Sequence, residues 1–257
     1  MKQNQIAKTA CLAGSALLLS GVSLSAEDTN KWQTSASAGL SLTRGNSETL
    51  LAVIGANSTL KRSVDEVLLG AAAAYGENTV TTQDPVTGKK HEDHQKTTQT
   101  ISAFGQYNHS ISDRWYAGFR VDFLHDDIAD LDYRFTFSPL LGYYAIKRPM
   151  TTLKFEAGPS GVIEKQGGEK DEYIGLRFAE RFDHKFSDKA KMWQSFEYIP
   201  QVDRFSNYLL IGEIGAEASL TQKLSLRGVF QDIYDNEPAP GRKQNDMKII
   251  TSLAYKF

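Results

Sequence analysis

The segment Trp115-Tyr-Ala-Gly-Phe-Arg-Val-Asp-Phe123 decides the fold, because its side chains alternate in character from one residue to the next. Its odd-numbered positions are all apolar, whereas the even-numbered positions include Arg120 and Asp122. A period of two places the two sets on opposite faces of a β-strand. We therefore expect a strand with an apolar and a polar face, with Phe119 near its middle on the apolar side and Gly118 on the polar side.

The same alternation recurs on both sides of this segment. Only Glu180 puts a charge on one of the apolar faces. This pattern predicts twelve strands, whose apolar faces span residues 36–42, 50–60, 67–75, 101–107, 115–123, 133–145, 153–163, 174–182, 192–202, 210–220, 224–230 and 247–257.

Alternation alone does not decide whether the apolar faces point inward, as in a water-soluble sandwich, or outward into lipid. Runs of about 10–14 residues are longer than ordinary soluble strands and long enough to cross a bilayer at a tilt. Aromatic residues gather near the strand ends, as in the two girdles of membrane barrels; they are Trp32, Tyr75, Tyr107, Trp115, Phe123, Tyr133, Tyr143, Tyr173, Phe182 and Tyr208. Leu253, Tyr255 and Phe257 share one apolar face and resemble the assembly signal of outer-membrane barrels. These features predict an all-β protein, a transmembrane antiparallel up-and-down β-barrel of the outer-membrane type with about twelve strands.

The expected connections alternate between short turns and longer loops. The longer set, predicted to be external, comprises Arg44–Glu48, Asn78–Gln95, His125–Leu131, Lys165–Asp171, Arg204–Asn207 and Asp235–Asn245. Pro139, Pro159 and Pro200 fall inside expected strands, where each removes a hydrogen-bond donor. We therefore expect bulges or bends at the three prolines.

Residues 1–26 read as a secretory signal peptide, which leaves residues 27–257 for the barrel. Lys2 and Lys8 precede an apolar or small stretch over 10–24, and a small-residue cleavage site follows. Removal of this segment takes away Cys11, the one cysteine, so a disulfide framework or a thiolate site is excluded. It also leaves 27 basic against 31 acidic residues, a formal charge of −4 that argues against nucleic acid as a partner. No uninterrupted apolar stretch of 18 residues remains, which excludes a transmembrane helix.

Several segments resemble an uncharacterised bacterial family described as salt-induced outer-membrane proteins, a domain-of-unknown-function family of β-barrels. They are Arg44-Gly-Asn-Ser47, residues 113–122, residues 131–144 and Phe155-Glu-Ala-Gly-Pro159. The resemblance extends over nearly all of the chain after residue 26. It implies an outer-membrane location, a β-barrel and a setting of envelope or salt stress, and it brings no catalytic residues.

Two histidine-containing segments could carry chemistry. His91 and His94 are three residues apart and could ligate a metal on a helix, although a solvated charge run explains them more simply. His125, Asp126, Asp127, Asp130 and Asp132 are expected at one rim, where a His–Asp pair could activate water in a surface hydrolase. A rim of solvated carboxylates is the simpler interpretation, so we expect no enzyme, no cofactor and no metal site.

The polar faces of the strands define the expected lumen. Its first four strands contribute small neutral residues, among them Ser37, Gly39, Gly55, Gly70, Ala72, Thr100 and Ser102, whereas the later strands contribute charges. The charged residues assigned to the lumen are Arg120, Asp122, Arg134, Lys154, Glu156, Arg177, Arg181, Glu197, Glu213, Glu217, Arg227 and Lys248. Two outcomes fit this set: the charges pair and close the barrel, or they face one another across water.

The sequence therefore predicts a narrow passive pore for ions or small polar solutes in the cell outer membrane. A closed barrel with a structural or partner-binding role, and the rim hydrolase, are the alternatives. The expected partners are outer-membrane lipid and lipopolysaccharide, with the barrel-assembly machinery and periplasmic chaperones during biogenesis.

Overall fold

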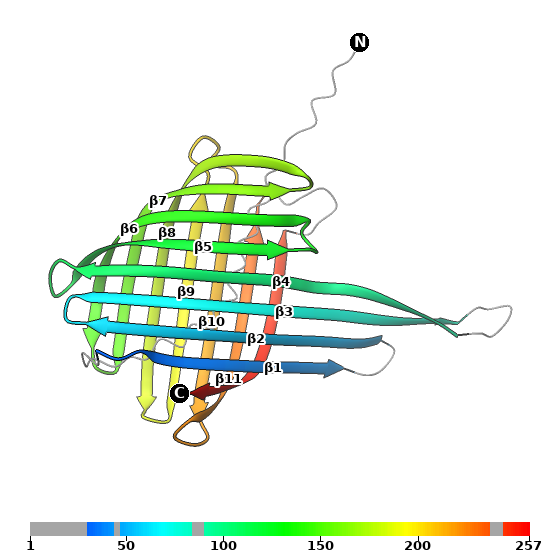
Figure 1. Ribbon diagram of the computed structural model, residues 1–257, viewed down its shortest axis with the longest axis horizontal. Coiled ribbons are helices and arrows are strands. Elements are labelled where there is room, and N and C mark those ends of the chain that lie inside the picture. Colours follow the sequence, from blue (N-terminus) through cyan, green and yellow to red (C-terminus); the bar gives the residue numbers. More distant parts are fainter. Residues whose placement is uncertain (1–29, 44–46, 84–89, 237–243) are drawn as a thin grey trace, which may run out of the picture.

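The chain forms a closed barrel of antiparallel strands (Figure 1). The computed structural model describes residues 30–43, 47–83, 90–236 and 244–257. Within them the strands are β1 (Gln33–Thr43), β2 (Ser47–Arg62), β3 (Asp65–Gln83), β4 (Lys90–Ser110), β5 (Trp115–Asp126), β6 (Leu131–Arg148), β7 (Thr151–Gln166), β8 (Glu169–Ser187), β9 (Ala190–Pro200), β10 (Tyr208–Ser219), β11 (Leu224–Asp235) and β12 (Asn245–Lys256).

Each strand pairs with its neighbours in the chain, and β1 pairs with β12 to close the ring, with Ala36 opposite Tyr255. This topology confirms the predicted twelve-stranded barrel. Among the described residues, no helix is long and apolar enough to cross a membrane. The expected signal peptide, residues 1–26, lies outside the described residues.

The two ends of the barrel differ in their connections. One end, here called the short-turn end, carries the connections at 63–64, 111–114, 149–150, 188–189 and 220–223, together with the start of β1 and the end of β12. The opposite end, the long-loop end, carries the connections at 127–130, 201–207 and 236–244. The connection predicted over Lys165–Asp171 is only a two-residue turn, because Gly167 and Gly168 both adopt positive φ, as tight hairpin turns require.

The hairpin of β3 and β4 projects past its neighbours at the long-loop end (Figure 1). β3 pairs with β4 as far as Gln83↔Lys90, whereas its pairing with β2 stops at Ser47↔Val80. The predicted loop over Asn78–Gln95 is therefore wrong, since most of that stretch is strand. β-branched threonines favour the extended backbone even without apolar alternation. Extended backbone over 90–96 also removes the helical spacing on which the His91–His94 metal hypothesis depended.

Pro139 and Pro159 interrupt the ladder between β6 and β7 without shifting its register. Pairing runs up to Phe137↔Gly161 and resumes in the same register at Leu141↔Ala157, which places the two prolines directly opposite each other. Two missing donors thus coincide in one short gap, and the bulges expected there do not occur. The third proline, Pro200, is the last residue of β9.

The two faces of the barrel wall have opposite character. Large apolar side chains point outward and are exposed, as Phe119, Phe137 and Phe178 illustrate. The inner face holds two buried apolar clusters, one of Val53, Ala72, Ala74, Trp193, Val229 and Ile250 and one of Leu209, Ile211 and Ile233. Tyr173 packs against the second cluster, so its assignment to an outer aromatic girdle is wrong: it has the inward parity of β8.

Candidate functional site

The barrel interior is the candidate site. All twelve charged residues assigned to the lumen lie on the inner face of their strands. Arg120, Arg134, Glu156, Arg177, Glu213, Glu217 and Arg227 are buried, and Asp122, Lys154, Arg181, Glu197 and Lys248 are half-buried. Burial of so many charges requires partners, because an unpaired charge loses its hydration without compensation.

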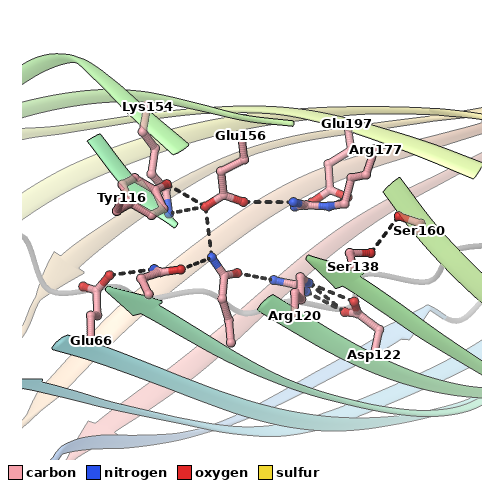
Figure 2. A network of polar contacts seen from close by, with 12 residues as sticks. Glu66, Tyr116, Arg120, Asp122, Ser138, Lys154, Glu156, Ser160, Arg177 and Glu197 are labelled. Carbon is pink, nitrogen blue, oxygen red and sulfur yellow. Dashed lines mark hydrogen bonds and ion pairs between the residues drawn. The ribbon is translucent and has the colours of Figure 1, made fainter. Parts of the chain in front are cut away.

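Glu156 on β7 is the hub of the central polar network (Figure 2). Its Oε1 accepts hydrogen bonds from Gln106 (3.0 Å), Tyr116 (2.8 Å) and Lys154 (3.1 Å). Its Oε2 accepts a hydrogen bond of 2.9 Å from Arg177 on β8. Four donors on one carboxylate fix its position and offset the cost of removing it from water.

Tyr116 reaches Glu156 by passing over β6. Its ring lies against Gly142, where a Cβ atom would come within 2.0 Å of a ring carbon. Gly142 therefore provides the space through which a side chain from β5 contacts one from β7. Any side chain at position 142 would displace the ring and break the hydrogen bond to Glu156.

The network continues from Glu156 in two directions across the lumen (Figure 2). Toward β9, Arg177 donates to both oxygens of Glu197, at 3.2 and 2.8 Å. Toward β5, Gln106 accepts a hydrogen bond of 3.2 Å from Arg120, which forms a bidentate pair with Asp122. The Arg120 guanidinium also lies 4.4 Å from the centre of the Phe104 ring.

Two cavities flank this network. One encloses about 70 Å³ beside Gln106, Lys154 and Glu156, and the other about 80 Å³ beside Asp122 and Arg134. Both have Arg120, Arg177, Glu197 and Ile211 in their walls, and we call these four residues the dividing layer. Each volume has room for several water molecules, since about 10–15 Å³ suffices for one.

Trp193 fills another part of the lumen. The residue is 1% exposed, and its Nε1 donates a hydrogen bond of 2.7 Å to Glu213. Its ring lies over Gly215, where a Cβ would come within 2.0 Å of a ring carbon. The inner wall of the first four strands is not uniformly small, because Val53 packs in the Trp193 cluster beside Ala72 and because Leu68 and Phe104 border a cavity.

Several other interior charges form local pairs toward the two ends. Arg134 pairs with Glu164, and Arg181 pairs with Asp183 at 2.8 Å. Glu217 near the short-turn end contacts Arg227 at 2.7 Å. Sequence reasoning missed Glu164 and Asp183 because both lie close to the expected connections. Their positions alternate with the apolar faces of their strands, which was a usable signal that they point inward.

The rim proposed for hydrolysis is occupied by structural contacts. His125 Nε2 lies 3.0 Å from Asp127, and its Nδ1 lies 2.9 Å from the carbonyl oxygen of Asp132. Asp126 accepts hydrogen bonds from the backbone of the 127–130 connection. Asp132 accepts a hydrogen bond of 2.5 Å from Lys165. In the described part of the chain, no group of three or more His, Cys, Asp or Glu residues could hold a metal ion.

The residues of the expected assembly signal lie on the outer face. Leu253 and Tyr255 of β12 and Phe257 beyond it are all exposed. The outward position is compatible with contact to lipid or to an assembly factor, and the role in assembly stays a prediction.

These features define the chain as a closed β-barrel of the outer-membrane type with a charged, largely filled interior. The chain belongs to the family described as protein of unknown function, DUF481, whose model matches residues 36–257.

A comparison with solved structures finds similar chains of low sequence identity. The NanC porin is 7% identical over 87% of this chain and 98% of its own, with a TM-score of 0.50. An outer membrane channel from Pseudomonas putida F1 (8% identity, 91% and 98% coverage, TM-score 0.49) and the translocator domain of the autotransporter NalP from Neisseria meningitidis (14% identity, 88% and 87% coverage, TM-score 0.47) are also similar. No curated protein matches the chain.

Proposed function

We propose that the chain is a narrow outer-membrane channel for ions or small polar solutes. The observation that carries this proposal is a pair of interior cavities bordered by charged side chains, with the dividing layer in the walls of both. A barrel that served only as a scaffold could fill its interior with apolar side chains, which avoids the cost of burying charges. Under this proposal the short-turn end faces the periplasm, and the long-loop end faces the exterior.

The dividing layer is the constriction of the proposed channel. Side chains of arginine and glutamate change rotamer far faster than strands rearrange, so they can admit an ion without opening the barrel. The link to salt or envelope stress and the cleavage of residues 1–26 stay predictions from the sequence.

Single-channel recording in planar lipid bilayers tests the channel. We expect small ion currents from the wild-type protein and larger currents from Arg120→Ala, because this change removes a guanidinium that borders both cavities. Arg114→Ala is the matched control, since Arg114 lies in a turn and is exposed. Absence of current from both wild type and Arg120→Ala at every voltage would refute the channel.

Ion selectivity gives a second test. Asp122 borders a cavity and its side chain is 34% exposed, so Asp122→Asn removes a negative charge from the path. We expect the reversal potential to shift toward anion selectivity. The shift should be larger at 0.1 M than at 1 M salt, because the screening length falls from about 10 Å to about 3 Å.

The closed barrel is the second candidate, and Trp193 is the observation that favours it. Its fully buried ring and the surrounding apolar cluster fill one side of the lumen. A silent wild-type protein that remains folded in the bilayer would establish this alternative.

A further inference from the structure

A third cavity opens at the short-turn end of the barrel. It encloses about 200 Å³ and is bordered by residues from β1, β2, β9, β11 and β12 together with Trp32 and Phe257. Three of its wall residues are basic, namely Lys191, Arg227 and Lys256. None of the described residues in its wall is acidic.

The three cations share one carboxylate that lies outside the cavity wall. Glu217 is 2.7 Å from Arg227, 3.3 Å from Lys191 and 3.6 Å from Lys256. Its side chain is 2% exposed, whereas that of Lys256 is 42% exposed. Among the side chains that these contacts join, one carboxylate therefore faces three cations, and the three cations border the cavity.

We propose that this cavity binds a phosphate group. Excess positive charge in a partly enclosed site attracts an anion, and arginine and lysine are the side chains that most often hold phosphate oxygens. Gln33, Ser35 and Thr59 in the same wall add side chains that can donate hydrogen bonds. A volume of about 200 Å³ accommodates a tetrahedral oxyanion with some water, since one water occupies about 30 Å³ in the liquid.

Phosphate binding goes beyond the proposed channel function, because the cavity lies at one mouth of the barrel and does not require the dividing layer to open. The same chemical group occurs in free phosphate and in phospholipid headgroups. A binding measurement in detergent micelles is independent of conductance, so the outcomes of the two proposals are distinguishable.

Isothermal titration of inorganic phosphate into the folded full-length barrel tests the site, with ionic strength held constant by chloride. We expect saturable binding to the wild type. Lys256→Gln and Lys191→Gln should each weaken it by about tenfold, because each removes a charge-assisted contact. Lys223→Gln is the matched control: Lys223 lies at the same end but on the turn, over the ring of Tyr255, and should leave binding unchanged.

Two results would overturn the proposal: no saturable phosphate binding to the wild type, or equal affinities for wild type, Lys256→Gln and Lys191→Gln. Circular dichroism and the gel mobility of unboiled samples verify that each variant is folded. A further titration with phosphatidylglycerol in the micelles distinguishes the sources. Competition supports a headgroup in the site, and unchanged phosphate affinity supports free phosphate.

Discussion

Ser138 and Ser160 share a hydrogen bond of 2.7 Å between their hydroxyl groups, at the point where Pro139 and Pro159 leave the β6–β7 ladder unpaired. Both serines are fully buried on the inner face. The side-chain bond thus connects the two strands where backbone bonds are missing (Figure 2).

Replacement of either serine is expected to destabilise the barrel. Ser138→Ala leaves the Ser160 hydroxyl buried without this partner, which costs about 1–3 kcal/mol. The double variant Ser138→Ala/Ser160→Ala should lose less than the sum of the single changes. Urea unfolding followed by tryptophan fluorescence measures these values. Ser252→Ala is the control, because its buried hydroxyl has no partner among the described residues and should contribute little; strictly additive losses would argue against the serine bond.

Adjacent positions on β6 test which face contacts lipid. Phe137 is 52% exposed on the outer face, and Thr136 borders an inner cavity. We expect Phe137→Lys to cost about 2–4 kcal/mol, because a cation near the bilayer midplane loses its hydration. Thr136→Lys should cost less, since a lumen cation keeps water. Equal losses in a refolding titration in lipid vesicles would contradict the assigned facing.

The neighbouring pair Gly118 and Phe119 cannot serve for this comparison. A Cβ atom at Gly118 would lie 2.1 Å from the carbonyl oxygen of Tyr107, so an arginine clashes with backbone before its charge matters. Arginine at residue 118 would therefore report a backbone clash and not the facing of β5.

The buried pair of Arg134 and Glu164 allows two free energies to be compared. One is the loss of stability when a single partner is replaced, and the other is the loss when both partners are replaced by apolar residues. Glu164→Gln should destabilise by about 3–5 kcal/mol, because it removes a buried carboxylate charge that pairs with the guanidinium. Arg134→Met combined with Glu164→Leu should recover most of this loss. Lys165→Gln is the control: its pair with Asp132 is exposed, and its removal should change stability little. A double variant as unstable as Glu164→Gln would contradict this explanation. The measurement is the urea midpoint of each variant.

Replacement of Trp193 is expected to change both the free energy of unfolding and the ion current. Trp193→Ala removes a fully buried ring and should cost about 3–5 kcal/mol. If the protein conducts, the variant should also carry larger currents, because the space left by the ring joins the lumen. Trp193→Phe keeps most of the packing but removes the donor to Glu213, so it should destabilise without enlarging the current. Identical currents from wild type and both variants would show that the ring lies outside the ion path.

Most of the barrel could be predicted from period two alone. A strand exposed to lipid on one side must be apolar at every second residue, and the run 115–123 obeys this rule without exception. The projecting part of β3 and β4 escaped prediction because the sequence over 78–95 does not alternate between apolar and polar residues. The opposition of Pro139 and Pro159 depends on register, which no local pattern encodes.

The interior could be predicted as a set of residues but not as a set of contacts. Parity assigns Glu156 and Arg177 to the lumen, yet their contact depends on the shape of the closed barrel. The hydrogen bond from Tyr116 to Glu156 needs an empty position at Gly142 on the strand between them. Trp193 was missed because the prediction for the lumen considered only charged and small residues, although residue 193 alternates with the apolar face of 192–202.

The projecting hairpin distinguishes the long-loop end of the barrel from the short-turn end. Pairing of β4 with β5 begins at Thr100↔Asp126, so in the described structure the amides of residues 90–98 face a neighbouring strand only on the β3 side. About half of their N–H groups therefore point to water, whereas the amides of the barrel wall are bonded on both sides. Brief exposure of the folded protein to heavy water would therefore deuterate the amides of this hairpin before those of the barrel wall.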